Sequence, residues 1–199
     1  NDYEVEVPYN YYICYVTLEN KNLSHLPVYL LSEDQMSRYA IYMATLGNRP
    51  DLFPGSEYVG KYTEPPEGYE VPREYLDDET FAAILSEAEK YIGYPYVWGG
   101  SSPATSFDCS GYVSWVINHS GWNVGRLGAQ GLYNICTPTS NPQPGDLVFF
   151  KGTYDTPGVS HCGIYVGDGR MLHCGDPIGY ANLNTSYWQS HFYAYGRLP

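Results

Sequence analysis

One cysteine and two histidines have the residue types and spacing of a nucleophilic site. Cys109 follows a Gly- and Pro-containing loop and Asp108, and it opens an apolar run typical of a helix. At a helix N-terminus, unpaired backbone N–H groups and the helix dipole favour a thiolate, and thiol pKa values there fall from about 8.5 to roughly 3.5–7.5. The same N–H groups can stabilise an oxyanion. Because a free cysteine is more often simply buried, Cys109 alone does not define such a site.

Two histidines are candidates for the base and for the group that orients it. His161 opens one predicted strand and His173 lies on the next, and the run GDG at 167–169 predicts a hairpin turn between them. A nucleophilic thiol needs a base close by and a third group that orients the base. One histidine on a strand is usually a core residue. Two on one hairpin, downstream of a cysteine at a helix start, indicate a Cys–His–His site.

The turn permits two registers, and only one lets both histidines act together. A two-residue turn at 168–169 would place His161 and His173 on opposite faces of the sheet. A three-residue loop, with Gly169 in the left-handed conformation, pairs His173 with Gly163 and puts both rings on one face. We therefore predict the three-residue loop.

Two further cysteines adjoin the histidines. The predicted register places Cys162 opposite Cys174, on the face away from the active site. Because a disulfide between directly opposed antiparallel residues is strained, we expect two buried thiols. The neighbours His161 and Cys162, with His173 and Cys174, also offer four zinc ligands. Adjacent strand residues point to opposite faces, so these side chains cannot converge on one ion, and we predict neither a metal nor a cofactor.

The elements that must position these residues fall into two blocks. Acidic residues at 77–79 suit a helix N-terminus, an apolar stripe runs on to Ile92, and Gly93 ends that helix. A second helix is predicted at 109–118. Strand patterns follow at 146–150, 161–166, 170–174 and 193–197. Helices followed by strands predict an α+β fold with an antiparallel sheet.

The first part of the chain has a different character. Residues 11–18 predict a strand, and residues 32–47 predict a helix that begins with Ser32 and Gln35 in the pattern of a capping box. One strand and one helix are too little for a core. We interpret the chain as an N-terminal extension at 1–48, a Pro/Gly-rich linker at 49–76 and a main domain at 77–199.

Composition excludes several classes of protein. Of the 199 residues, 43% are hydrophobic, too many for a disordered chain. No apolar run reaches the roughly 18–20 residues that span a bilayer. Ten Lys and Arg against 22 Asp and Glu give a net charge of −12, so nucleic acid is not an expected ligand. With five cysteines, at least one thiol is unpaired within the chain.

Several runs together carry a family resemblance. They are YVWGG at 96–100, FDCSG at 107–111, PGDLVFF at 144–150 and HCGIYVGDG at 161–169, with His173 after them and a weaker motif at Arg126 and Gln130. In this order, over about residues 77–199, they resemble the NlpC/p60 family of papain-like cell-wall cysteine peptidases. The resemblance implies a papain-like NlpC/p60 fold with helices packed on an antiparallel sheet. That family usually has an aliphatic residue or alanine where Cys162 and Cys174 stand.

The resemblance also implies an activity. It is hydrolysis of the amide between γ-D-glutamyl and the diamino acid in peptidoglycan stem peptides. Cys109 would be the nucleophile, His161 the base and His173 the residue that orients it, with Tyr96 near the thiol to help hold the oxyanion. The substrate would lie outside the cytoplasm, so we expect an extracellular or cell-wall-facing protein with its signal or membrane anchor upstream of Asn1.

Four residues are candidates for substrate binding. By resemblance, Asp108 and Ser110 match positions that grip the free amino group of an N-terminal L-Ala, although Asp108 is equally suited to cap the helix. Gln130 either lines the cleft or lies on a helix surface. Trp98, beside a pair of glycines, either walls the cleft or belongs to the core.

Two other functions stay open from the sequence. The same fold can act on another amide or acyl substrate, or it can bind peptidoglycan without cleaving it. The intact cysteine and histidines weigh against the second. The sequence does not name the diamino acid or the oligomeric state.

Overall fold

The computed structural model describes Gln35 and residues 68–199. The strand predicted at 11–18 lies outside the described residues, and so does the helix predicted at 32–47, apart from Gln35, which is helical and exposed. The division into extension, linker and main domain therefore stays a prediction. Within the last part of the predicted linker, a 3₁₀ helix, η3 (Arg73–Asp77), begins.

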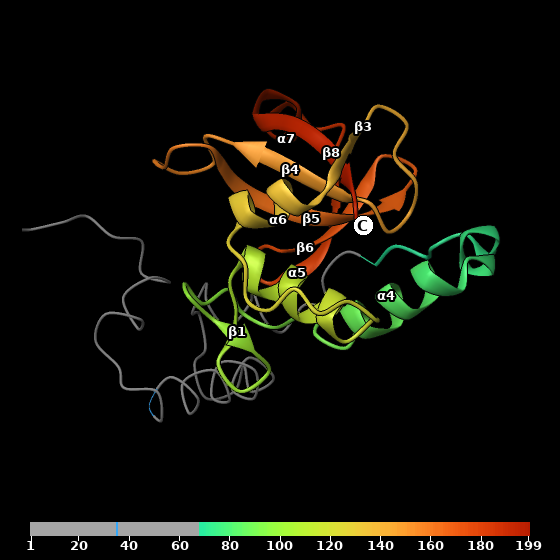
Figure 1. Cartoon of the computed structure of the whole chain (residues 1–199), viewed down its shortest axis with the longest axis horizontal. Helices are drawn as coiled ribbons and strands as arrows, with labels where there is room; N and C mark the ends of the chain where they lie inside the picture. Colours follow the sequence, from blue (N-terminus) through green and yellow to red (C-terminus); the bar gives the residue numbers. More distant parts are fainter. Residues whose placement is uncertain (1–34, 36–67) are drawn as a thin grey trace, which may run out of the picture.

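A six-stranded antiparallel sheet forms the centre of residues 68–199 (Figure 1). In spatial order its strands are β3 (Thr137–Thr139), β8 (Phe192–Arg197), β4 (Leu147–Lys151), β5 (Val159–Gly167), β6 (Arg170–Cys174) and β7 (Ile178–Asn182). The four predicted strands are present, β6 with the predicted bounds, whereas β3 and β7 were not predicted. A separate short ladder joins β1 (Ser101–Ser102) to β2 (Ser106–Phe107). The α+β class with an antiparallel sheet is confirmed.

Helix α5 (Cys109–Asn118) has the bounds predicted from the sequence. It packs against β5 and β6, and most of its residues are buried. Its first turn also lies against the glycine-rich loop, where a Cβ added to Gly111 would be only 2.1 Å from the carbonyl oxygen of Gly100. Glycine is therefore required in the FDCSG run, because it lets the start of α5 approach this loop closely.

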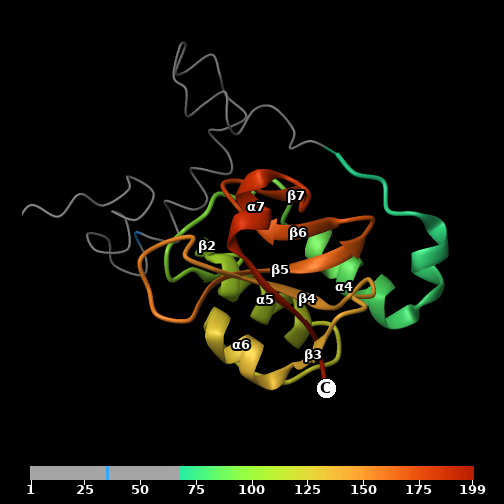
Figure 2. The same ribbon diagram turned by 90° about the horizontal axis from the view of Figure 1, so that it is seen from above.

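Three other helices surround the sheet. Helix α4 (Glu79–Glu89) buries the predicted apolar stripe beside α5 but ends before Gly93, because the chain turns at Lys90. Helices α6 (Ala129–Ile135) and α7 (Ser186–His191) were not predicted. In Figure 1, α4 and α5 lie below the sheet and α7 above it, and Figure 2 shows α7 beside β6 and β7.

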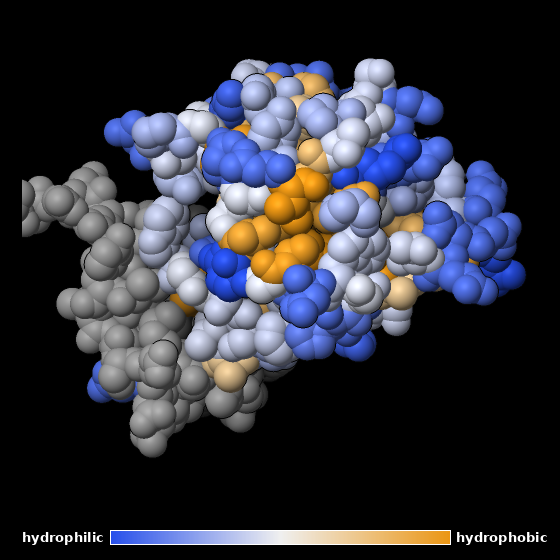
Figure 3. Space-filling view, viewed as in Figure 1, coloured by the Kyte–Doolittle hydropathy of each residue, from blue (hydrophilic) through white to orange (hydrophobic). Residues whose placement is uncertain are grey.

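The two faces of the sheet are covered unequally. The larger apolar cluster lies between the sheet and helices α4 and α5, and a smaller one, containing Val148, Phe150 and Met171, lies on the face of α7. Figure 3 shows an apolar surface patch over α6, surrounded by hydrophilic side chains. No helix within the described residues is long and apolar enough to cross a membrane.

The hairpin of β5 and β6 has the predicted register but not the predicted turn. Ile164 pairs with Leu172, and a Cβ added to Gly163 would lie 3.0 Å from the His173 Cβ. Both agree with the register that places His173 opposite Gly163. The turn itself has two residues, both at positive φ, and the register shift comes from an irregularity between Tyr165 and Gly167. The predicted three-residue loop is therefore wrong, because the bulge lies before the turn.

Candidate active site

The Cys109 sulfur lies where the start of α5 meets the first part of β5. Asp108 caps the helix, and only 6% of Cys109 is exposed. The carbonyl oxygen of Ser160 is 4.0 Å from the sulfur. A hydrogen bond from the Cys162 thiol, together with the charge and hydrogen bond of His161, holds the pKa of Cys109 well below its usual value against the opposing effect of burial. Cys109 therefore favours the thiolate.

His161 and His173 face each other across β5 and β6. The distance from His161 Nε2 to His173 Nδ1 is 2.9 Å. Burial, reinforced by the charge of His161, lowers the pKa of His173 well below its usual value, so His173 is neutral. An imidazolium at His161 must therefore donate its Nε2–H to His173 Nδ1. This leaves Nδ1 of His161 as the nitrogen that can reach Cys109.

Aromatic rings hold the His161 imidazole in place. Trp188 of α7 stacks on it, with ring centroids 5.3 Å apart and an interplanar angle of 26°. The same indole meets His173 edge-on at 5.2 Å, and Phe150 of β4 contacts His161 at 5.9 Å. An indole face over an imidazolium is a favourable cation–π arrangement. Trp188 was not predicted as a site residue, because no local pattern links it to the histidines.

Asp108 is the centre of a hydrogen-bond network at the start of α5. Its carboxylate accepts the backbone N–H of Gly111 at 2.7 Å, that of Gly99 at 3.1 Å and the Ser110 hydroxyl at 3.0 Å. Arg126 Nη2 lies 2.8 and 2.7 Å from the two carboxylate oxygens, and Arg126 Nη1 lies 3.0 Å from Ser110 Oγ. Burial raises the pKa of Asp108, and Arg126 opposes that rise. The predicted capping role of Asp108 is confirmed.

Cys162 lies closer to the site than the sequence predicted. Cys162 and Cys174 are both free thiols, as expected. The prediction that their face points away from the active site is wrong for Cys162, which lies close enough to Cys109 to lower the pKa of that thiol. The reason is that α5 packs on this face of β5, which brings Cys109 close to Cys162, while His161 on the same strand also reaches the sulfur. The Cys174 thiol instead donates to the Phe107 carbonyl oxygen at 3.2 Å.

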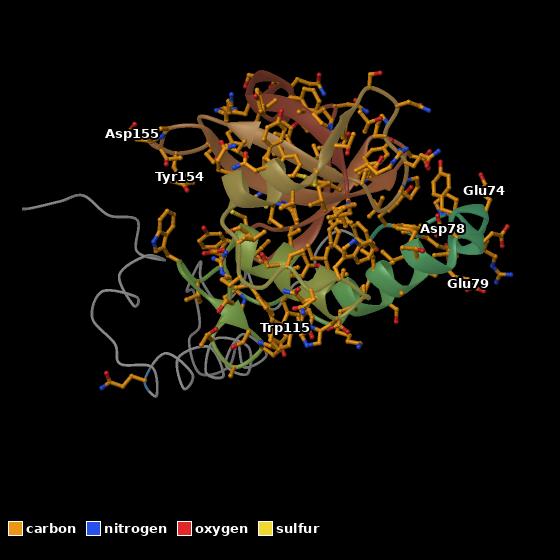
Figure 4. The ribbon with its side chains drawn as sticks, viewed as in Figure 1. Glu74, Asp78, Glu79, Trp115, Tyr154 and Asp155 are labelled. Carbon is orange, nitrogen blue, oxygen red and sulfur yellow. The ribbon has the colours of Figure 1, made fainter. Side chains whose placement is uncertain are left out.

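Two tyrosines lie near the thiol, and one of them contacts Trp98. Burial, and next the charge of Cys109, raise the pKa of both Tyr96 and Tyr154 above its usual value, which places both phenols within electrostatic reach of the sulfur. Tyr154 is 41% exposed and makes an edge-to-face contact with half-buried Trp98 at 5.1 Å. Figure 4 shows Tyr154 on the loop between β4 and β5, at the opposite end of the molecule from the start of α4.

Gln130 lies on α6 and holds the start of β5. Its Oε1 accepts the backbone N–H of Val159 at 2.9 Å, and its Nε2 donates to Asn134 at 2.8 Å. A Cβ added to Gly158 would lie 2.4 Å from the Gln130 Oε1. Gln130 thus anchors the segment that leads directly into His161. The sequence left open whether Gln130 lines the cleft or lies on a helix surface. The structure places it, exposed, on helix α6 with a hydrogen bond to Val159 at the start of β5.

In the part of the chain that the structure describes, the metal-ligating residue types are not gathered into a cluster. Within residues 68–199, no group of three or more His, Cys, Asp and Glu side chains could hold a metal ion. The His161 and His173 rings contact each other, whereas the Cys162 and Cys174 thiols contact Cys109 and a backbone carbonyl on the other side of the sheet.

Comparison with known proteins assigns the family. The model of the NlpC/P60 family matches residues 93–197, more than half of the chain, and the chain belongs to this family. The resemblance inferred from the sequence motifs is confirmed.

Two curated relatives come from Bacillus subtilis (strain 168). The bifunctional muramidase/DL-endopeptidase CwlT is 43% identical over 121 residues, covering 59% of this chain and 36% of that protein. The gamma-DL-glutamyl hydrolase is 42% identical over 112 residues, covering 54% of this chain and 27% of that protein. The chain thus spans only 27–36% of the length of these two relatives.

A solved structure from Staphylococcus aureus subsp. aureus Mu50 shows the same fold. It is a lipoprotein-like NLP/P60 family protein with a TM-score of 0.59 and 32% sequence identity. The similarity covers 84% of this chain and 62% of that chain.

Proposed function

We propose that this protein is a cysteine endopeptidase that hydrolyses the γ-D-glutamyl–diamino acid amide of peptidoglycan stem peptides. The observation that carries the proposal is the juxtaposition of a thiolate-favouring Cys109 with His161, which in turn contacts a neutral His173 at 2.9 Å. A thiolate, an adjacent base and a third group that orients the base are the requirements of nucleophilic acyl transfer.

The first step is acylation of Cys109. Its thiolate attacks the γ-carbonyl carbon, and the carbonyl π electrons move onto the oxygen. The Cys109 backbone N–H and the Tyr96 hydroxyl are our proposed donors to this oxyanion. When the tetrahedral intermediate collapses, the C–N bond breaks and the His161 imidazolium gives its proton to the leaving amine. The products are a thioester on Cys109 and a free amine.

The second step returns the enzyme to its starting state. Neutral His161 takes a proton from water, and the resulting hydroxide attacks the thioester carbon. The C–S bond breaks, which releases the γ-carboxylic acid and restores the thiolate–imidazolium pair, and the acid then loses its proton to solvent to become the γ-carboxylate. Throughout, His173 accepts from His161 Nε2–H and fixes the ring orientation, as the partner of a base must.

The named relatives support the substrate class. CwlT is described as a DL-endopeptidase, and a second relative as a γ-DL-glutamyl hydrolase. An endopeptidase and a γ-glutamyl hydrolase agree with the amide cleavage proposed here. A peptidoglycan substrate also places the protein outside the cytoplasm, which is why we propose a cell-wall-facing location.

Product analysis tests this function. The purified protein is incubated with purified peptidoglycan, and the soluble products are identified by mass spectrometry. The proposal requires fragments ending in D-glutamate or D-isoglutamine, with the matching new amine on the diamino acid. Cleavage at another amide would favour the second substrate class, and binding without any cleavage would favour the non-catalytic module.

We propose that Asp108 and Ser110 lie at the subsite for the first stem residue, but that Arg126 rather than the substrate neutralises Asp108. The family resemblance implied that Asp108 and Ser110 grip the free amino group of an N-terminal L-Ala. With both carboxylate oxygens on Arg126, a substrate ammonium gains little there, so we expect a preference of about threefold or less.

The test compares a free tetrapeptide with the same peptide attached to muramic acid, using the native protein and Arg126→Gln. Removing the guanidinium leaves Asp108 without its charge partner, so the preference for the free amine should rise on the order of tenfold. A strong preference in the native protein would mean that the ammonium displaces Arg126.

A further inference from the structure

The β4–β5 loop, residues 152–158, carries an aromatic side chain that reaches across to the loop before α5. The chain leaves β4 at Gly152 and returns to β5 at Gly158, with φ values of 68° and 80° that favour glycine. Tyr154 in this loop is 41% exposed (Figure 4). Its ring meets Trp98 edge-on, with ring centroids 5.1 Å apart. The contact therefore joins the β4–β5 loop to the glycine-rich loop that precedes α5.

The base of the β4–β5 loop is fixed beside the proposed nucleophile. Thr153 donates its backbone N–H to Ser160 Oγ at 3.0 Å, and the two hydroxyl oxygens are 2.7 Å apart. Ser160 is fully buried, and its carbonyl oxygen lies 4.0 Å from the Cys109 sulfur. The residue before Tyr154 is thus bonded to the strand residue that approaches the sulfur.

Trp98 is held from the side of α5. The next residue, Gly99, donates its backbone N–H to the Asp108 carboxylate at 3.1 Å, and Asp108 directly precedes Cys109. One ring of the aromatic pair is therefore anchored through the residue before Cys109, and the other through the strand residue beside its sulfur. The pKa of Tyr154, which is raised by burial and then by the charge of Cys109, agrees with a position next to the thiol.

The tip of the β4–β5 loop, residues 154–157, is exposed except for half-buried Thr156. The chain after it is held, because the backbone N–H of Val159 donates to Gln130 Oε1 at 2.9 Å. Exposed loops with few buried apolar contacts open at low cost, and such loops control access to many active sites. Only 6% of Cys109 is exposed. Because a γ-carbonyl carbon must come within about 3–3.5 Å of the sulfur, a stem peptide requires the two rings to separate.

The β4–β5 loop lies on the side of the leaving group. It is anchored at Ser160, the neighbour of His161, and in the proposed mechanism His161 protonates the amine of the diamino acid. In a stem that is cross-linked through its diamino acid, that residue carries a second peptide. Such a substrate is branched directly after the scissile amide, so it needs a wider opening than a linear stem.

We propose that Tyr154 and Trp98 form an aromatic gate over Cys109, which limits access to the thiol by size and favours linear stems over stems cross-linked at the diamino acid. The choice between stems rests on the proposed function, whereas the size limit does not. A reaction that needs the open gate is slowed by the fraction of molecules in which the gate is open. An aromatic contact is strong enough to lower that fraction by up to about tenfold.

The first experiment compares two alkylating reagents that share one reactive group, iodoacetamide and its fluorescein conjugate. Peptide mass spectrometry assigns the modification to Cys109. Tyr154→Ala should raise the ratio of the bulky reagent's rate to the small reagent's rate by about tenfold. Tyr154→Phe keeps the ring and should leave this ratio within about twofold of the native value.

Tyr193 provides a matched control. It is 39% exposed, and its ring centroid lies 5.2 Å from that of Tyr133. Tyr193→Ala therefore removes an exposed tyrosine and an aromatic contact of similar length, but between β8 and α6. The ratio of the two alkylation rates should not change in this variant.

The second experiment compares kcat/KM for a linear stem peptide with that for the same peptide cross-linked through its diamino acid. Tyr154→Ala should raise the ratio of cross-linked to linear on the order of tenfold. A raised alkylation ratio with an unchanged preference between the stems would overturn the assignment to cross-linked stems.

The gate itself is overturned by an unchanged alkylation ratio in Tyr154→Ala that is folded by circular dichroism, or by an equal rise in Tyr193→Ala. Because alkylation needs no turnover, these results can be read even if the protein proves not to hydrolyse stem peptides. Failure of the gate is thereby distinguished from failure of the proposed function.

Discussion

Cys109 and His161 meet in one site but are held in different ways. Around Cys109, the start of α5 is fixed by hydrogen bonds, with the Asp108 carboxylate joining two backbone N–H groups, a hydroxyl and the Arg126 guanidinium. Around His161, the ring is fixed mainly by stacking on Trp188 and by one contact to His173. The sulfur therefore depends on a polar network and the imidazole on ring packing.

This difference predicts that substitutions around Cys109 and substitutions around His161 change different properties of the protein. Loss of one partner from a buried polar network leaves other groups unsatisfied, so the helix side should respond chiefly in stability. Loss of a ring contact lets the imidazole move without leaving a buried charge, so the hairpin side should respond chiefly in rate.

The largest effect on stability is expected from Asp108→Ala. It removes a helix cap and leaves Arg126 without its ion-pair partner, so the free energy of unfolding should fall by about 2–3 kcal/mol. Asp78→Ala is the matched control, because Asp78 caps α4 through Thr80 and Phe81 at an exposed position. It should cost about 1 kcal/mol. Urea denaturation measures both, and equal losses would show that the Arg126 pair adds nothing.

A smaller effect, seen in rate, is expected from Trp188→Leu. Without the stacked indole the His161 ring is less well oriented, so kcat/KM should fall about tenfold. Trp188→Phe keeps an aromatic face and should retain most of the activity. Both variants are assayed well below their unfolding temperatures. A leucine variant as active as the native protein would show that ring packing does not position His161.

The smallest effect concerns His173 and pH. Burial lowers the pKa of His173 in the folded state below its unfolded value of 6.5. Below that pH the unfolded chain takes up a proton that the folded chain does not, so this residue makes stability fall as pH falls. His173→Gln should reduce the loss of unfolding free energy between pH 7 and pH 5. An unchanged slope would mean that His173 is protonated in the folded protein.

The sequence predicted the helix side of the site better than the hairpin side. Asp108, Cys109 and the whole of α5 follow from signals contained in one short stretch, namely a loop, a cap and an apolar run. The pairing of His161 and His173 followed from requiring both rings on one face. The turn was nevertheless mispredicted, because glycines on both sides of Asp168, at 167 and 169, allow the bulge at either place.

The missed residues depend on packing between distant elements. Trp188 reaches His161 only because α7 lies over that face of the sheet, and α7 itself was not predicted. Arg126 was predicted as part of a weak motif. Its ion pair with Asp108 was not predicted, because it depends on the path by which the chain after α5 comes back to the start of that helix. Cys162 was placed on the correct face, yet the position of α5 on that face brings it to the nucleophile.

The most direct test of the central claim is the rate at which folded Cys109→Ala hydrolyses purified peptidoglycan, compared with the native protein. Cys109 is small and contributes little core volume, so circular dichroism and the unfolding temperature should be close to native. We expect the native protein to release stem-peptide fragments and Cys109→Ala to release none above the level without enzyme. Measurable turnover by the folded alanine variant would contradict the account.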